Sequence, residues 1–142
     1  DINDQMLHIR DDSSIEAKKQ YLDSIRELTS KYFTGFDKIS IQVVFETFGE
    51  NDTSSARQLA SIYHSLTQEY VNLAVPSDWI ELHRQLIIYY KNSEAVYEAM
   101  ANYLTDPIKG YVALEVIESV LAHGARVQEL IALHAQEVGI LP

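Results

Sequence analysis

The chain has 142 residues, of which 46% are hydrophobic, and this size and composition suit one folded domain with a hydrophobic core. Eleven Lys and Arg residues stand against 21 Asp and Glu residues, so the net charge is −10. This charge argues against nucleic acid and anionic lipid as partners, because both are bound by basic patches. A basic protein partner stays open, beside the plainer interpretation that the charge maintains solubility.

The chain has no cysteine, which excludes disulfides, thiol catalysis and cysteine-based zinc sites and fits either the cytoplasm or an extracytoplasmic space. No window reaches ~18 consecutive apolar residues, so no membrane insertion by this segment is expected. The chain begins at Asp1 rather than Met, which predicts a mature or excised form. Whether a targeting segment or an anchor was removed is open.

The first half of the chain predicts a lead-in followed by three helices. Residues 1–12 are either a poorly ordered lead-in or a short first helix. Ser13 and Glu16 match a capping box, so a helix is predicted from there to about Phe33. Residues 36–48 alternate as a strand would, but a single strand has no partner elsewhere, and a short helix is predicted instead. A further helix is predicted to end near Leu73.

The second half predicts a long helical hairpin. Ser77 or Asp78 is expected to cap a helix that ends near Leu104. Asp106 followed by Pro107 predicts the next helix start, because Asp accepts from free N–H groups of the first turn and Pro suits the first helical position. Two long helices joined by so short a turn must lie nearly antiparallel.

The inner face of each helix follows from apolar residues that recur at spacings of three and four. Before the turn these are Trp79, Leu82, Leu86, Tyr89, Ser93, Val96, Met100 and Tyr103. After the turn Gly124 lies on the corresponding stripe, which favours a close helix–helix contact over a kink. The sequence therefore predicts the all-α class: an antiparallel helical bundle of four longer helices plus one short helix, in a single domain over residues 1–142.

The histidines do not form a metal motif: no two are four residues apart, and none stands three after a Glu. They are His8, His64, His83, His123 and His134. His123 and Arg126 have the offset of a phosphotransfer domain, but Val127 occupies the position of its Gly. No catalytic residue, metal ligand or cofactor is predicted. An enzyme that assembles His64, His83 or His134 with carboxylates from different helices stays an alternative.

Nine tyrosines are the unusual feature of the composition. Those on or beside inner stripes mostly indicate core packing, with each hydroxyl at the edge of the bundle. The sharper interpretation is a tyrosine-rich cavity between helices that binds a small molecule or a peptide. Tyr90 and Tyr111 lie off the main stripes and are predicted to be exposed contact residues. The predicted ligand-binding residues are Tyr63, Tyr70, Trp79, His83 and Tyr89.

The segment from Val75 to His83, Val-Pro-Ser-Asp-Trp-Ile-Glu-Leu-His, is followed at a distance by Asp-Pro-Ile-Lys-Gly at residues 106–110. With these two motifs the chain resembles a group of uncharacterised helical proteins from uncultivated bacteria with very small genomes. The resemblance covers residues 36–121. Members of the group often carry an N-terminal signal or membrane anchor, which implies an extracytoplasmic location. The resemblance implies no activity.

A well-patterned core without a catalytic constellation predicts a non-enzymatic helical-bundle module. We expect it to act through a protein partner, as the soluble part of a membrane-anchored or secreted protein. The alternative is the small-molecule or peptide binder with the tyrosine-rich cavity, which would need a pocket of ~300 Å³ or more. The apolar stripes leave open whether one chain buries them or two copies share them as a homodimer.

Overall fold

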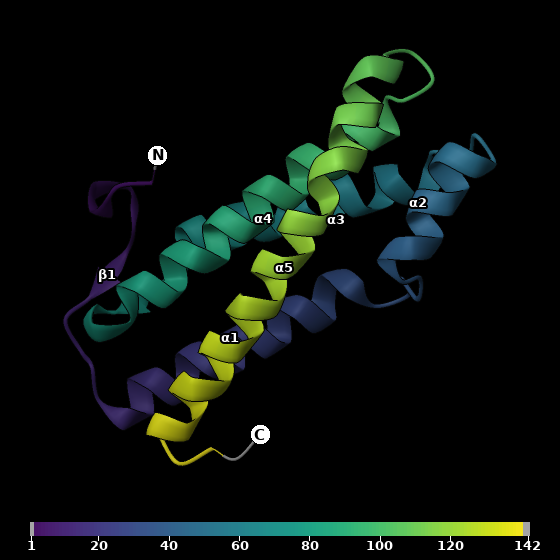
Figure 1. Cartoon of the computed structure of the whole chain (residues 1–142). Helices are drawn as coiled ribbons and strands as arrows, with labels where there is room; N and C mark the ends of the chain where they lie inside the picture. Colours follow the sequence, from purple (N-terminus) through teal and green to yellow (C-terminus); the bar gives the residue numbers. More distant parts are fainter. Residues whose placement is uncertain (1, 141–142) are drawn as a thin grey trace.

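The computed structural model describes residues 2–140. These residues confirm the all-α class, and successive long helices run in opposite directions (Figure 1). One helix is short and four are longer, as predicted. The helices are α1 (Ile15–Phe33), α2 (Ser40–Gly49), α3 (Ser54–Asn72), α4 (Ile80–Ala101) and α5 (Pro107–Glu137).

Helix α4 is the centre of the bundle, because it packs against α3 on one side and α5 on the other. Its buried positions therefore come as adjacent pairs, such as Leu86 with Ile87 and Val96 with Tyr97. A helix with one neighbour would bury only one stripe. Helix α5 runs obliquely across α4, and its second half reaches α1.

In the turn of the hairpin, the start of α5 agrees with the prediction from the sequence, whereas the end of α4 does not. Asp106 is the N-cap of α5, where its Oδ1 accepts a hydrogen bond from the Lys109 backbone N–H at 3.2 Å, and Pro107 is the first helical residue. Helix α4 ends at Ala101, three residues before the predicted end. Asn102 ends it because its side-chain amide donates back to the Glu98 carbonyl, which is a helix-terminating contact.

Two predicted caps are wrong. The N-cap of α1 is Ser14, whose hydroxyl accepts from the Ala17 backbone N–H, whereas the hydroxyl of Ser13 lies 2.8 Å from that of Ser77. Ser77 belongs with Asp78 and Trp79 to a short 3₁₀ turn, η2 (Ser77–Trp79), ahead of α4. The expected cap of α4 is absent because the 3₁₀ turn leads directly into the helix, and Asp78 pairs with Lys18 instead.

The short helix predicted over residues 36–48 is confirmed from Ser40, where α2 begins, whereas residues 36–39 are not helical. Val43 and Thr47 lie one turn apart and are fully buried, and the Thr47 hydroxyl donates to the Val43 carbonyl at 2.8 Å. Gly35, with φ +85°, ends the preceding helix α1 as expected of a residue that must adopt the left-handed conformation.

The lead-in is neither a helix nor without structure. After a 3₁₀ turn, η1 (Asp4–Met6), the two-residue strand β1 (Ile9–Arg10) pairs in parallel with β2 (Val75–Pro76). Leu7 is buried beside this pair, and the Val75 backbone N–H donates to the His8 carbonyl at 2.9 Å. Asp1 lies outside the described residues.

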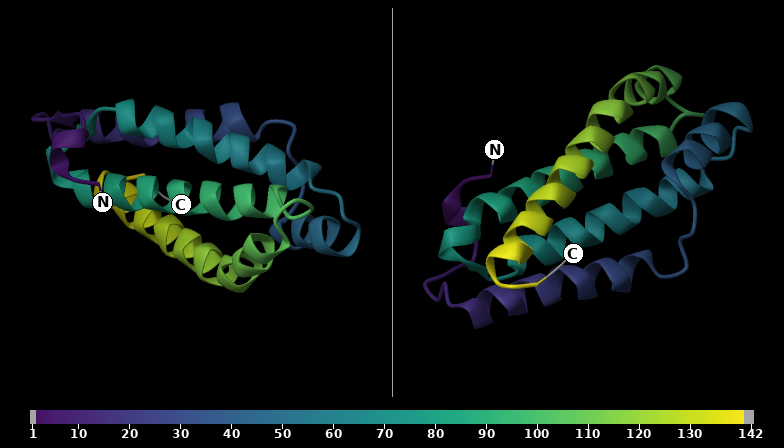
Figure 2. Two further views of the ribbon diagram at one scale, coloured as in Figure 1. Left: turned by 90° about the horizontal axis from the view of Figure 1, so that it is seen from above. Right: turned by 60° about the horizontal axis from the view of Figure 1, so that its bottom comes forward.

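The two ends of the bundle differ. Helix α2 and the α4–α5 turn lie together at one end, and β1 lies at the other (Figure 2). None of the helices formed by residues 2–140 combines the length and apolar character that crossing a membrane would require.

Candidate functional site

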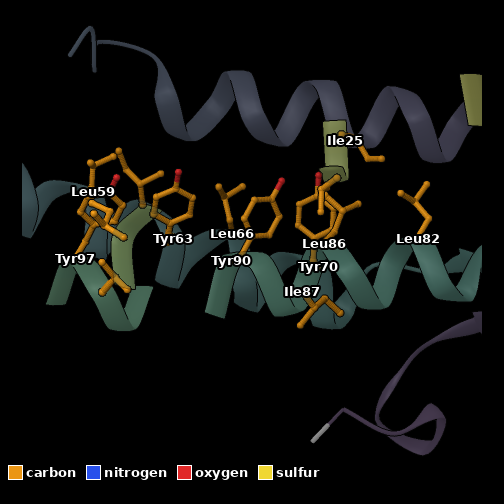
Figure 3. Packing of buried hydrophobic residues seen from close by; sticks show 14 of the residues in the cluster. Ile25, Leu59, Tyr63, Leu66, Tyr70, Leu82, Leu86, Ile87, Tyr90 and Tyr97 are labelled. Carbon is orange, nitrogen blue, oxygen red and sulfur yellow. The ribbon is translucent and has the colours of Figure 1, made fainter. Parts of the chain in front are cut away.

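The five predicted ligand-binding residues lie in or against the bundle core. Tyr63 and Tyr70 come from α3, Trp79 ends η2, and His83 and Tyr89 come from α4. Tyr70 and His83 are fully buried, Trp79 is 2% exposed, and Tyr89 is half-buried. Figure 3 shows Tyr63 and Tyr70 in one row with Leu66, Leu86 and Tyr90, packed between the helices.

The aromatic rings in this row contact one another. Tyr63 stacks on Tyr97 with ring centroids 5.8 Å apart, and Tyr70 lies 5.0 Å from Tyr90. Tyr90 is only 6% exposed, so the prediction that it is an exposed contact residue is wrong. It is buried because α4 buries two adjacent stripes, and Tyr90 lies on the second one.

His83 is a fully buried histidine that holds one hydrogen bond. Its Nδ1 lies 2.7 Å from the hydroxyl of Tyr21, on α1. Its Nε2 and the Tyr70 hydroxyl are buried and find no hydrogen-bond partner within residues 2–140. Burial lowers the pKa of His83 to about 4, because the charged imidazolium is poorly solvated there. His83 is therefore neutral at pH 7, and its contacts are those of a packed side chain.

The surface hollows of residues 2–140 that we find lie away from the predicted ligand-binding residues. The five that we find range from about 270 to 610 Å³, and none of these five is lined by a predicted ligand-binding residue. The largest is an open depression at the start of α3, between Asn51 and Ile62. That a ligand binds among Tyr63, Tyr70, Trp79, His83 and Tyr89 stays a prediction, and it would need these packed side chains to separate.

Three of the other four histidines have separate neighbours. His64 Nδ1 lies 2.7 Å from the Glu94 carboxylate, and His123 Nε2 lies 2.8 Å from the Gln85 side-chain oxygen. His134 packs edge-on against Trp79 and bonds the Leu130 carbonyl. Across residues 2–140, no three side chains of the types that ligate metals are grouped closely enough to hold an ion.

Exposed apolar side chains gather at the end of the bundle where α2 meets the α4–α5 turn. We call this surface the tip patch, and its members are Ile41 and Phe45 of α2, Leu104 of the turn, and Ile108, Tyr111 and Val112 of α5. Ile41 is 70% exposed and Ile108 78% exposed. The exposure of Tyr111 confirms the prediction made for that residue.

Aromatic contacts at this end of the bundle join α2 to the α4–α5 hairpin. The Phe48 ring of α2 stacks on Tyr111 of α5 with centroids 5.8 Å apart, and it contacts Tyr103 edge-on at 4.8 Å. The hydroxyls of Tyr103 and Tyr111 lie 3.0 Å apart. These contacts hold α2 against the start of α5, so the exposed apolar residues of both helices lie at the same end of the bundle.

The tip patch was missed in the sequence, although a signal existed. Ile108 and Val112 are one turn apart on a face of α5 that the inner stripe does not use, and Ile41 and Phe45 have the same spacing on α2. A second apolar row on a helix already supplied with an inner face indicates a surface that another molecule can cover.

Charged side chains around the tip patch are mostly acidic. Lys38 Nζ lies 2.7 Å from the Glu46 carboxylate, and this hydrogen bond lowers the pKa of Glu46. The hydroxyl of Ser54 lowers the pKa of Asp52, at the start of α3. Both carboxyl groups are therefore ionised at neutral pH, and the tip presents apolar side chains among negative charges.

No family model, curated protein or solved structure matches this chain.

Proposed function

We propose that this chain is a non-enzymatic helical-bundle module that binds another protein through the tip patch. The observation that carries the proposal is the exposure of six large apolar side chains at one end of the bundle, where Phe48 of α2 stacks on Tyr111 of α5. Contiguous apolar surface is costly to leave in water, and on folded proteins it commonly marks an interaction site.

The packing of the predicted ligand-binding residues supports the same proposal. Tyr63, Tyr70, Trp79 and His83 pack the core, so they stabilise the bundle and leave the surface to carry function. The resemblance to helical proteins with an N-terminal signal or anchor suggests an extracytoplasmic module, and the cysteine-free composition fits that location as well as others.

Selection of peptides from a random displayed library tests the proposal. The wild-type chain is the bait, and the double variant Ile41→Ser/Ile108→Ser is the counter-selection bait. Because both isoleucines are exposed, the double variant should fold as the wild type does. We expect enriched peptides whose affinity, measured by fluorescence anisotropy, falls about tenfold or more on the double variant.

The matched control is Ile15→Ser, which removes another exposed isoleucine from the start of α1, at the end of the bundle away from the tip. Peptide affinity should stay within about twofold of wild type on this control. Peptides that bind both variants as well as wild type would refute the proposal, as would a selection that enriches no peptide.

A further inference from the structure

We infer that the segment docked on the tip patch is a cationic amphipathic helix. The inference rests on the proposed function and adds the chemistry of the partner. Three features of the tip carry it: its net charge, its unpaired carboxylates and the absence of a free strand edge.

The charge of the tip is strongly one-sided. The tip consists of α2, the hairpin turn and their flanks, over residues 36–52 and 102–119. It holds seven carboxylates and two lysines, so its net charge is −5. This is half of the chain's net charge of −10. A partner that buries the apolar side chains also brings its own rim within a Debye length of these carboxylates, about 8 Å at physiological salt, so a basic rim is favoured.

Among residues 2–140, six of these seven carboxylates have no cationic side chain within 4 Å, and three of the six lie at the end of α2 or on α5. Glu50 follows α2, and Glu115 and Glu118 lie on α5. Within residues 2–140 the ion pairs leave all three without a cationic partner inside 4 Å, whereas Glu46 holds Lys38. Lysine or arginine side chains of a partner can therefore pair with these three carboxylates without breaking an existing contact.

The secondary structure of the tip favours a helical partner over an extended one. Only helix and turn contribute to the tip in the described chain, since its sole strand pair lies at the other end. An extended segment would leave its backbone N–H and C=O groups unpaired against an apolar surface, which is unfavourable. A helix satisfies its own backbone and can lay one apolar face against the rows on α2 and α5.

A second copy of this chain is a poorer occupant. Two tips facing each other would bring two surfaces of net charge −5 together, and like charges at an interface are repulsive. The same charge disfavours an anionic partner of any kind. The complement that remains is apolar on one face and basic at its margins.

Synthetic peptides test the inference directly. The probe is an amphipathic Leu/Lys helix of about 18 residues, compared with a Leu/Glu peptide of identical pattern and a Leu/Lys peptide of scrambled order. Binding to wild-type chain is measured by fluorescence anisotropy at about 150 mM salt, where weak long-range attraction is screened. We expect the Leu/Lys helix to bind about tenfold or more tightly than either other peptide.

Charge variants locate the effect. The triple variant Glu50→Gln/Glu115→Gln/Glu118→Gln should weaken the Leu/Lys helix about tenfold, because three exposed pairs are lost. The matched control Asp11→Asn/Glu16→Gln/Glu27→Gln removes three exposed carboxylates from the lead-in and α1, and affinity should change less than about twofold. Equal weakening by both triple variants would show attraction to overall charge and would overturn the inference.

The remaining outcomes separate the inference from the proposed function. If the Leu/Glu helix binds as well as the Leu/Lys helix, and both depend on Ile41 and Ile108, the tip binds protein but the inferred partner chemistry is wrong. If no peptide, including those selected from the random library, depends on Ile41 and Ile108, the proposed function itself fails. Self-association of wild type that Ile41→Ser/Ile108→Ser abolishes would overturn the inference in favour of a second copy.

Discussion

The core between α3 and α4 and the tip formed by α2 and α5 use the same residue types in opposite ways. In the core, aromatic rings contact one another from several helices and exclude solvent, as Tyr63, Tyr70 and Tyr90 do. At the tip, Phe45 and Tyr111 remain more than half exposed. The difference comes from the number of neighbouring helices, since α4 has long neighbours on both sides whereas α2 makes its main contacts with α3 alone.

Apolar spacing identifies a helix face that can be covered, but it does not say which part of this chain or of a partner covers it. For α4 the cover comes from the same chain. For the tip no part of residues 2–140 supplies it.

Replacing a core isoleucine should cost far more stability than replacing the same residue at the tip. Ile87 is fully buried, so Ile87→Ala should lower the free energy of unfolding by about 2 to 5 kcal/mol. Ile108 is 78% exposed, and Ile108→Ala should change it by less than about 0.5 kcal/mol. Urea denaturation followed by circular dichroism measures both. A large loss for Ile108→Ala would show that the tip is covered in solution.

The buried histidine should make the core sensitive to acid. His83 has a pKa of about 4 in the folded chain and 6.5 as its ordinary value, so below pH 6.5 the unfolded state binds a proton that the folded state does not. The part of the free energy of unfolding that depends on a neutral His83 is thus complete above pH 6.5 and is lost as pH falls towards 4. Lowering the pH from 7 to 5 should therefore reduce the free energy of unfolding by about 2 kcal/mol.

The variant His83→Gln isolates this contribution. Gln does not titrate, so the loss of stability between pH 7 and pH 5 should shrink by about 2 kcal/mol relative to wild type, whatever the variant's stability at pH 7. Ile87→Val, which removes a buried methylene from the same helix but no titrating group, should leave the pH dependence near that of wild type. An unchanged pH dependence in His83→Gln would show that water reaches the imidazole in the folded state.

Features that depend on local sequence were predictable. The Asp106–Pro107 helix start needs only a side-chain acceptor and a fixed φ, and both are properties of the residues themselves. Gly124 was expected to mark a close contact, and a Cβ at this position would lie 2.8 Å from the Tyr89 ring. The short helix over residues 36–48 followed from the absence of a partner strand.

Features that depend on how many helices surround a residue were not predictable. Tyr90 looked exposed because one stripe was assigned to α4, and only the packing of both α3 and α5 against it reveals the second stripe. For the tip patch the apolar spacing on α2 and α5 was visible in the sequence, but the sequence does not show that neighbouring helices leave these rows uncovered. The β1–β2 pair was also missed, because a two-residue strand has no periodicity to detect. The N-cap of α1 was assigned to the wrong serine, because Ser13 and Ser14 are adjacent and sequence spacing alone does not show which hydroxyl caps the helix.

The cap of α5 should contribute a moderate amount of stability where the hairpin turns into the tip. Asp106→Ala removes the acceptor for the Lys109 N–H and should lower the free energy of unfolding by about 1 kcal/mol. Asp106→Asn keeps an acceptor oxygen and should cost little. Denaturation measures the loss, and faster hydrogen exchange of the Lys109 amide in the alanine variant locates it. Equal stability of the two variants would mean that the side chain does not cap the helix.

The smallest expected effect decides whether the tip is one surface. A double-mutant cycle of Phe48→Leu and Tyr111→Leu should give a coupling of about 0.5 kcal/mol, the low end for aromatic pairs, because Tyr111 is half exposed. Phe48→Leu with Leu133→Ala, an exposed site further along α5, should be additive within about 0.3 kcal/mol.

The coupling matters because the stack joins α2 to α5 directly at the tip. Tyr111→Phe separates its two interactions, since it keeps the ring on Phe48 and removes the hydroxyl that faces Tyr103. If Phe48 and Tyr111 prove additive, the apolar rows of α2 and α5 move independently. A partner would then meet two small patches, and neither is large enough to support the binding function proposed for the whole tip.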